Sequence, residues 1–108
     1  MTITADDTRV LAALADETRQ GILDVLGRAP ASASALAREL PISRQGTMKH
    51  LAVLESARLV RGAREGREVV YAVDTAPLRA AAEALARASE HWDRQLLLLK
   101  RAAEHPEP

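Results

Sequence analysis

The sequence predicts a mainly α-helical fold with one small β-hairpin, on three observations. Hydrophobic residues make up 47% of the 108 residues, yet there is no Phe and only one Trp and one Tyr. Ala, Leu and Val must therefore fill the core, and such small side chains favour closely packed helices. Apolar residues recur at helical spacing except in residues 59–73, which are typical of two strands on either side of a tight glycine turn. We expect a single domain over residues 1–108.

Three helices are expected before residue 41, each from apolar residues at helical spacing. Their ranges are about 6–14, 17–27 and 32–40. Asp16 and Ser32 are suited to cap the second and third helices, since each side chain can accept a free N-terminal N–H. Residues 28–31 are expected to form a loop between them.

A fourth helix follows after a short break. Pro41 disfavours helical backbone in the residue before it, and Ser43 then offers a new N-cap for a helix over about residues 43–56. Two helices joined by a turn of three or four residues form a helix-turn-helix. In DNA-binding proteins the second of the two enters the major groove, so we call residues 43–56 the recognition helix.

A hairpin and a long helix complete the chain. Residues 59–73 are expected to form two strands joined by a tight turn at Glu65 and Gly66. A hairpin directly after a recognition helix is a wing. The last helix is expected over about residues 75–103, capped by Thr75 with Pro77 in its first turn. The full prediction is a winged helix-turn-helix of order α-α-α-α-β-β-α.

The formal net charge is zero, but positive charge is concentrated in residues 41–67, with six basic against two acidic residues. A local basic excess is typical of a surface that binds DNA phosphates. On the recognition helix, Thr47, Leu51 and Leu54 form the expected inward stripe, with His50 packed and hydrogen-bonded beneath the helix. The candidate DNA-binding residues lie on the other side: Ser43, Arg44, Gln45, Met48 and Lys49.

Each of these five side chains has a chemistry suited to DNA. Arg44 can donate two hydrogen bonds to guanine, Gln45 can pair with adenine, and Met48 can contact a thymine methyl group. Lys49 can reach guanine or a phosphate, and the Ser43 hydroxyl can donate to a phosphate beside the helix N-terminus. The alternative is a solvated helix face without a partner.

The wing carries three arginines. Arg64 and Arg67 flank the turn, where they can bind phosphates or enter the minor groove, whereas Arg61 lies further from the tip and is expected to face solvent. The alternative is an edge hairpin that basic residues merely keep soluble.

The pattern of apolar residues in the last helix predicts a dimer. Its apolar residues step by four and three in a sustained heptad pattern that a domain of this size cannot fully cover. We expect a two-fold homodimer built from the first and last helices; the alternative is that the stripe folds back onto its own core. The candidate interface residues are Val10, Leu11, Leu14, Leu78, Leu85, Trp92, Leu96 and Leu99.

With these residues placed, the chain resembles the arsenic-repressor-like (ArsR/SmtB) family of winged-helix regulators over about residues 8–101. The resemblance implies a homodimer that binds double-stranded operator DNA and represses a nearby operon, which commonly includes the regulator's own gene. An inducer then relieves the repression. The segments that carry it are LADETRQGIL (14–23), LARELPIS (36–43), HLAVLESARLV (50–60) and VYAV (70–73).

Two departures from the family pattern bear on the prediction. Many members bind metal through a Cys-x-Cys pair in the third helix, and others through spaced Asp and His residues in the last helix. This chain has no Cys, and Glu90, His91 and Asp93 lack that spacing, so the resemblance implies a branch that senses no metal. Arg58 stands where the family often has glycine between helix and wing, where a positive φ would cost Arg more than Gly.

Several function classes are excluded at this stage. The absence of Cys rules out disulfides and thiolate chemistry. No leader or membrane-spanning run is recognisable, so we expect a cytoplasmic protein without a membrane partner. No acid–base cluster or phosphate-binding loop predicts catalysis, and we expect no enzyme, metal or cofactor. The rival functions are a winged-helix module that binds protein and a nucleoid-type DNA binder with little sequence preference.

Overall fold

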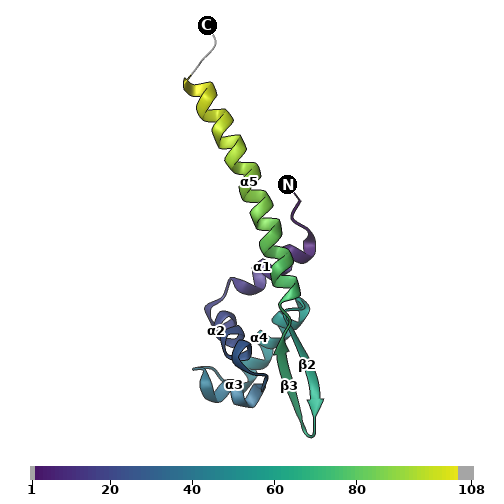
Figure 1. Cartoon of the computed structure of the whole chain (residues 1–108). Helices are drawn as coiled ribbons and strands as arrows, with labels where there is room; N and C mark the ends of the chain where they lie inside the picture. Colours follow the sequence, from purple (N-terminus) through teal and green to yellow (C-terminus); the bar gives the residue numbers. More distant parts are fainter. Residues whose placement is uncertain (1, 105–108) are drawn as a thin grey trace.

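The computed structural model describes residues 2–104, which form five helices and three strands (Figure 1). The helices α2, α3 and α4 lie with the β-hairpin at one end of the molecule, and the C-terminal part of α5 projects from the other end. The bounds in chain order are α1 (Ala5–Leu14), α2 (Glu17–Arg28), β1 (Ala31–Ser32), α3 (Ala33–Glu39), α4 (Arg44–Ser56), β2 (Val60–Glu65), β3 (Glu68–Val73) and α5 (Ala76–Glu104). The expected succession of four helices, a hairpin and a long helix is confirmed.

The predicted caps explain where three of the helices begin. The side chains of Asp16, Ser32 and Ser43 each accept the backbone N–H three residues further on, at 3.0, 3.2 and 3.0 Å. Each cap satisfies an N–H that has no partner within the helix. The first residues of α2, α3 and α4 are therefore set by local sequence.

Two helix starts differ from expectation. In α1, Thr4 and Asp7 form a reciprocal capping box, in which each side chain accepts the other residue's N–H at 3.1 Å. At α5 the expected cap was Thr75, but the carboxylate of Asp74 accepts the N–H of Ala76 at 3.0 Å. An ionised acceptor one residue earlier serves the same positive helix end.

One strand lies where the sequence predicted the end of a loop and a helix cap. Residues 31–32 form β1, which pairs antiparallel with β3 so that Ala31 lies opposite Tyr71 and Ser32 opposite Val70. The sheet has the order β1-β3-β2. Two residues carry no periodic pattern of their own, so this strand exists because of a pairing partner far along the chain.

The hairpin turn sits one residue later than expected. Glu65 pairs with Glu68, which leaves Gly66 and Arg67 as a two-residue turn. Gly66 has φ +63°, and Arg67 is not among the described residues with positive φ. A positive φ at the first turn position alone is the pattern of a type II′ turn, which follows the twist of the strands and favours glycine.

The core is mainly aliphatic, and every helix contributes to it, including α5 through Ala81. Among residues 2–104, Tyr71 is the one aromatic side chain that belongs to this core. The first helix contributes Val10 and Ala13, which are 2% and 1% exposed. The largest side chains that are essentially inaccessible are Ile22, Leu36, Thr47, Leu51, Leu54 and Leu59.

The long helix α5 packs through alanines and leaves its leucines exposed. Ala81, Ala84 and Ala88 are buried on the side that contacts α1, since they recur at helical spacing and have no bulk to hold the helices apart. The leucine stripe is centred about 60° further around the helix, at 100° per residue, and its members are exposed: Leu78, Leu85, Trp92, Leu96 and Leu99. The alternative in which the stripe covers its own core is therefore wrong for the described chain.

Arg19 joins α1, α2 and α4 through one partly buried guanidinium. Its Nε donates to the carbonyl of Ala13 at 2.6 Å and its Nη2 to that of Ala12 at 3.2 Å, at the C-terminal end of α1, where the Ala12 carbonyl also accepts the N–H of Ala15. Nη1 lies 3.3 Å from Nδ1 of His50 on α4. The side chain is only 16% exposed, so the contacts with Ala13 and His50 are partly shielded from water.

Replacing Arg19 by alanine should lower the free energy of unfolding by about 2–4 kcal/mol, since two hydrogen bonds from a charged donor are lost and the carbonyl of the buried Ala13 loses its guanidinium partner. Thermal and urea unfolding at fixed protein concentration would measure the change. Arg9→Ala is the matched control: Arg9 is 63% exposed and meets Asp6 at 3.6 Å, so its loss should cost under about 1 kcal/mol. Equal costs for the two variants would contradict this account.

The end of α4 explains Arg58. Its N–H donates to the carbonyl of Glu55 and that of Leu59 to the carbonyl of Leu54, both at 2.9 Å, which is the Schellman pattern that ends a helix with a left-handed residue. Arg58 has φ +62° and is the non-glycine residue with positive φ among residues 2–104. The expected conflict is therefore real, and the arginine adopts the conformation that glycine favours.

Arg58→Gly should stabilise the protein by about 0.5–1 kcal/mol. The left-handed conformation costs a residue with a Cβ about 1–2 kcal/mol. Glycine avoids this cost, but its unfolded chain is more flexible, and ordering it offsets about half of the gain in stability. Arg58→Ala removes the same charge but keeps the Cβ, so it should give no gain. A stabilisation shared by both variants would show that the side chain, and not the backbone, is responsible.

Candidate nucleic-acid interface

The helix-turn-helix is formed by α3 and α4. Leu40 has extended backbone at φ −111° and ψ 150°, as a residue before proline should. Thr47 is fully buried on α4 and its hydroxyl donates to the carbonyl of Ser43 at 2.8 Å. With Leu51 and Leu54 it forms the predicted inward stripe. This packing fixes which face of α4 remains outside.

The outer face of α4 carries the five candidate DNA-binding residues. All five are exposed, and Met48 retains 42% of its surface. At 100° per residue, positions 44, 45, 48 and 49 fall on one side of the helix. The structure thus brings these candidates together on one face, as the sequence predicted: Ser43, Arg44, Gln45, Met48 and Lys49.

Beneath this face, His50 has the packed role expected of it. Its ring is about three-quarters buried, with Nδ1 facing the Arg19 guanidinium and lying 4.0 Å from Oδ1 of Asp16. The backbone N–H of Arg19, with the nearby cations, holds the pKa of Asp16 below its ordinary value. His50 therefore connects the recognition helix to the start of α2.

The wing places its arginines in two settings. Arg64 and Arg67 are exposed at the tip, with Arg64 opposite Val69 and Arg67 in the turn. Arg61, expected to face solvent only, donates to Asp74 at 2.9 Å although its side chain is 80% exposed. Arg61 therefore joins the base of the wing to the start of α5. In Figure 1 the wing tip lies at the same end of the molecule as α3 and α4.

Sequence reasoning missed Ser34 in this region. Its hydroxyl accepts a hydrogen bond from Nε of Arg44 at 3.1 Å, which links α3 to the first residue of α4. Serine is common in the first turn of a helix, so its presence at position 34 does not by itself indicate a functional contact. No periodicity of helices or strands relates positions 34 and 44. The turn between the two helices creates this contact.

The candidate dimer residues fall into two groups. On α1, Val10 lies in the chain's own core, and Leu11 and Leu14 are half-buried, so this helix offers less free apolar surface than expected. On α5 the side chains are open to solvent: Leu78 (37% exposed), Leu85 (44%), Trp92 (55%), Leu96 (60%) and Leu99 (66%).

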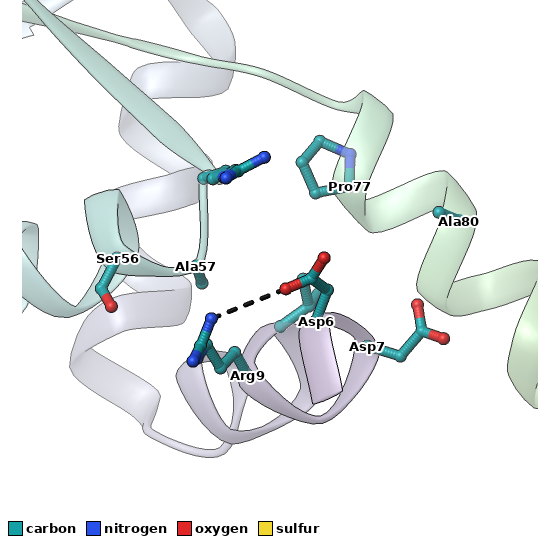
Figure 2. Close-up of a pocket in the computed structure, with 9 residues that line it drawn as sticks. Asp6, Asp7, Arg9, Ser56, Ala57, Pro77 and Ala80 are labelled. Carbon is teal, nitrogen blue, oxygen red and sulfur yellow. Dashed lines mark ion pairs between the residues drawn. The ribbon is translucent and has the colours of Figure 1, made fainter. Parts of the chain in front are cut away.

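A cavity of about 200 Å³ lies where α1, the end of α4 and the start of α5 meet (Figure 2). Asp6 and Arg9 form an ion pair across its α1 side, and Pro77 and Ala80 line the wall from α5. The lining mixes both charge signs with small apolar side chains, so it indicates no particular ligand. None of its residues belongs to the predicted DNA-contact set.

Within residues 2–104, none of the helices combines the length and the apolar character needed to cross a membrane. In the same range no three His, Asp or Glu side chains come close enough together to hold a metal ion.

Comparison with known proteins places this architecture in a family. A helix-turn-helix domain model matches residues 14–63. The chain is 41% identical over 88 residues to the HTH-type transcriptional regulator Rv2034 of Mycobacterium tuberculosis, covering 82% of this chain and 79% of that protein. An ArsR-like transcriptional regulator from Rhodococcus sp. RHA1 superposes with a TM-score of 0.82 at 46% identity, over 92% of this chain and 93% of that one. The chain belongs to the ArsR family.

This ArsR-family protein is thus a DNA-binding transcriptional regulator with a winged helix-turn-helix. A second curated relative, the transcriptional repressor SdpR of Bacillus subtilis, is 31% identical over 70 residues, 65% of this chain and 78% of that protein. The homodimeric winged helix-turn-helix DNA-binding domain of Mb0332 from Mycobacterium bovis superposes with a TM-score of 0.65 at 29% identity, covering 82% and 83% of the two chains. The ArsR-family fold accounts for the position of both α4 and the wing.

Proposed function

We propose that the protein is a sequence-specific repressor that binds an operator near its own operon as a homodimer. The observation that carries this proposal is the exposed face of α4, which presents Arg44, Gln45 and Lys49 on a helix-turn-helix whose wing tip lies at the same end of the molecule. Groups that can bind base edges and groups that can bind phosphates are thus offered on one side. The relative SdpR is named as a repressor, which supports the sign of regulation.

In this proposal the first turns of α4 enter the major groove. Arg44, Gln45 and Met48 contact base edges, while Lys49 contacts guanine or a phosphate. Ser43 keeps its cap of α4 and donates its hydroxyl to a phosphate. Arg64 and Arg67 contact phosphates or the neighbouring minor groove from the wing.

The homodimer in this proposal is formed through α5. Its alanine face is already occupied by α1, yet its leucine stripe is exposed. The C-terminal part of the helix projects from the body (Figure 1). A continuous apolar stripe of this kind is typical of a helix that packs against a second copy. The related Mb0332 domain is homodimeric. A two-fold dimer would read half-sites about 10 bp apart or a multiple of that distance.

A titration of the purified protein with its own upstream region tests the proposal. A labelled duplex of that region is competed with a scrambled duplex of equal length, at two salt concentrations. Tight binding that survives the competitor supports a specific regulator, and the protected region then gives the operator and its half-site spacing. Repression in a reporter strain, compared with a strain lacking the protein, tests the direction of regulation.

Two results would favour the rival functions. Equal and weak binding to both duplexes, lost at higher salt, would indicate the nucleoid-type binder, because such binding depends only on phosphate contacts. No binding at low salt would favour the winged-helix module that binds protein.

A further inference from the structure

The hydrogen bond between Ser34 and Arg44 joins the two helices of the helix-turn-helix at the point where DNA would enter. Arg44 is the first residue of α4 and is exposed, and its Nε donates to Oγ of Ser34 on α3 at 3.1 Å. Ser34 itself is partly buried within α3, so the acceptor sits on a packed element. The contact therefore restrains a long side chain that would otherwise move freely at a helix end.

The bond also determines which part of the guanidinium is free. An arginine has five N–H donors, one on Nε and two on each of the terminal nitrogens. When the Nε–H donates to Ser34, two N–H donors that point the same way remain, one on Nη1 and one on Nη2, at the tip of the guanidinium. That end can make the two-bond contact with O6 and N7 of guanine. Holding Nε also reduces the rotamer freedom that Arg44 would lose on binding.

We infer that Ser34 is a positioning residue that orients Arg44 for guanine recognition and thereby sets the base preference at one position of each half-site. Ser34 touches no base in this arrangement and acts only through Arg44. The inference rests on the proposed function, in which Arg44 contacts a base edge.

The test uses the operator duplex, a duplex with a single base pair replaced at each position in turn, and the scrambled duplex. Ser34→Ala should reduce the ratio of operator to scrambled affinity by about three- to tenfold, the range expected for one net hydrogen bond. The loss should fall on one base pair per half-site, with the melting temperature and the salt dependence unchanged. Ser34→Thr keeps the hydroxyl and should restore the ratio. Ser56→Ala, at an exposed serine at the other end of α4, should change nothing.

A double-mutant cycle separates positioning from a general effect on α3. In an Arg44→Ala background, Ser34→Ala should have no further effect, because there is no guanidinium left to orient. Additive losses, or an equal loss on the operator and the scrambled duplex, would overturn the inference while leaving the proposed function intact. A wild-type protein without any preference for its upstream region would overturn both.

Discussion

Arg44→Glu combined with Lys49→Glu is expected to reduce operator affinity by about a thousandfold or more. Each wild-type side chain can supply a charge-assisted contact to a base or phosphate, worth roughly 1–3 kcal/mol, and each glutamate adds repulsion from the DNA backbone. Both side chains are exposed on the outer face of α4, so the change acts on the surface. Fluorescence anisotropy with the operator and scrambled duplexes measures the loss.

The fold should tolerate this double replacement. Neither residue forms an ion pair within the described chain, and a glutamate at position 44 meets the positive end of the helix dipole, which favours acids. The melting temperature should therefore stay the same or rise slightly. The matched control is Arg87→Glu with Arg101→Glu, which changes net charge equally at exposed positions about 200° around α5 from Leu85 and Leu99. An equal loss of affinity in the control would attribute binding to net charge rather than to the α4 face.

Trp92→Glu should convert the homodimer into monomers and weaken operator binding by more than about a hundredfold. Trp92 lies in the middle of the exposed stripe on α5, between Leu85 and Leu96, where an interface would bury a charge without a partner. A monomer binds one half-site at a time and loses the gain in effective concentration that the linked second half provides. Light scattering at several protein concentrations and the operator titration measure the two effects.

Arg87→Glu alone is the control for this prediction, because it places the same charge on the same helix on the side opposite the stripe. It should remain dimeric with unchanged operator affinity. A Trp92→Glu protein that stays dimeric would place the interface elsewhere in the chain.

The elements that the sequence predicted well are those whose ends depend on neighbouring residues. Asp16, Ser32 and Ser43 cap their helices within three residues of themselves, so the starts of α2, α3 and α4 could be predicted from local sequence. Strand β1 could not, because its two residues become a strand only through their pairing with β3. Long-range pairing of this kind leaves no trace in the spacing of a single segment.

Side-chain partners were harder to foresee than exposure. The inward and outward faces of α4 follow from helical periodicity, and the structure reproduces them. The partners of Arg61 and Arg44 depend instead on how separate elements come together, 13 and 10 residues apart in the chain. Likewise, the heptad pattern of α5 identified an apolar stripe but gave no sign that small alanines would form the intramolecular contact.

The position of Trp92 gives the protein a spectroscopic signal of its own. The chain has a single Trp, and it is 55% exposed on α5, whereas α4 and the wing tip lie at the other end of the molecule. Selective excitation of this indole therefore reports on one place only. Burial against a second copy would shift its emission toward the blue, and DNA bound at the opposite end would leave the emission unchanged. Self-association and DNA binding can thus be followed separately in one unlabelled sample.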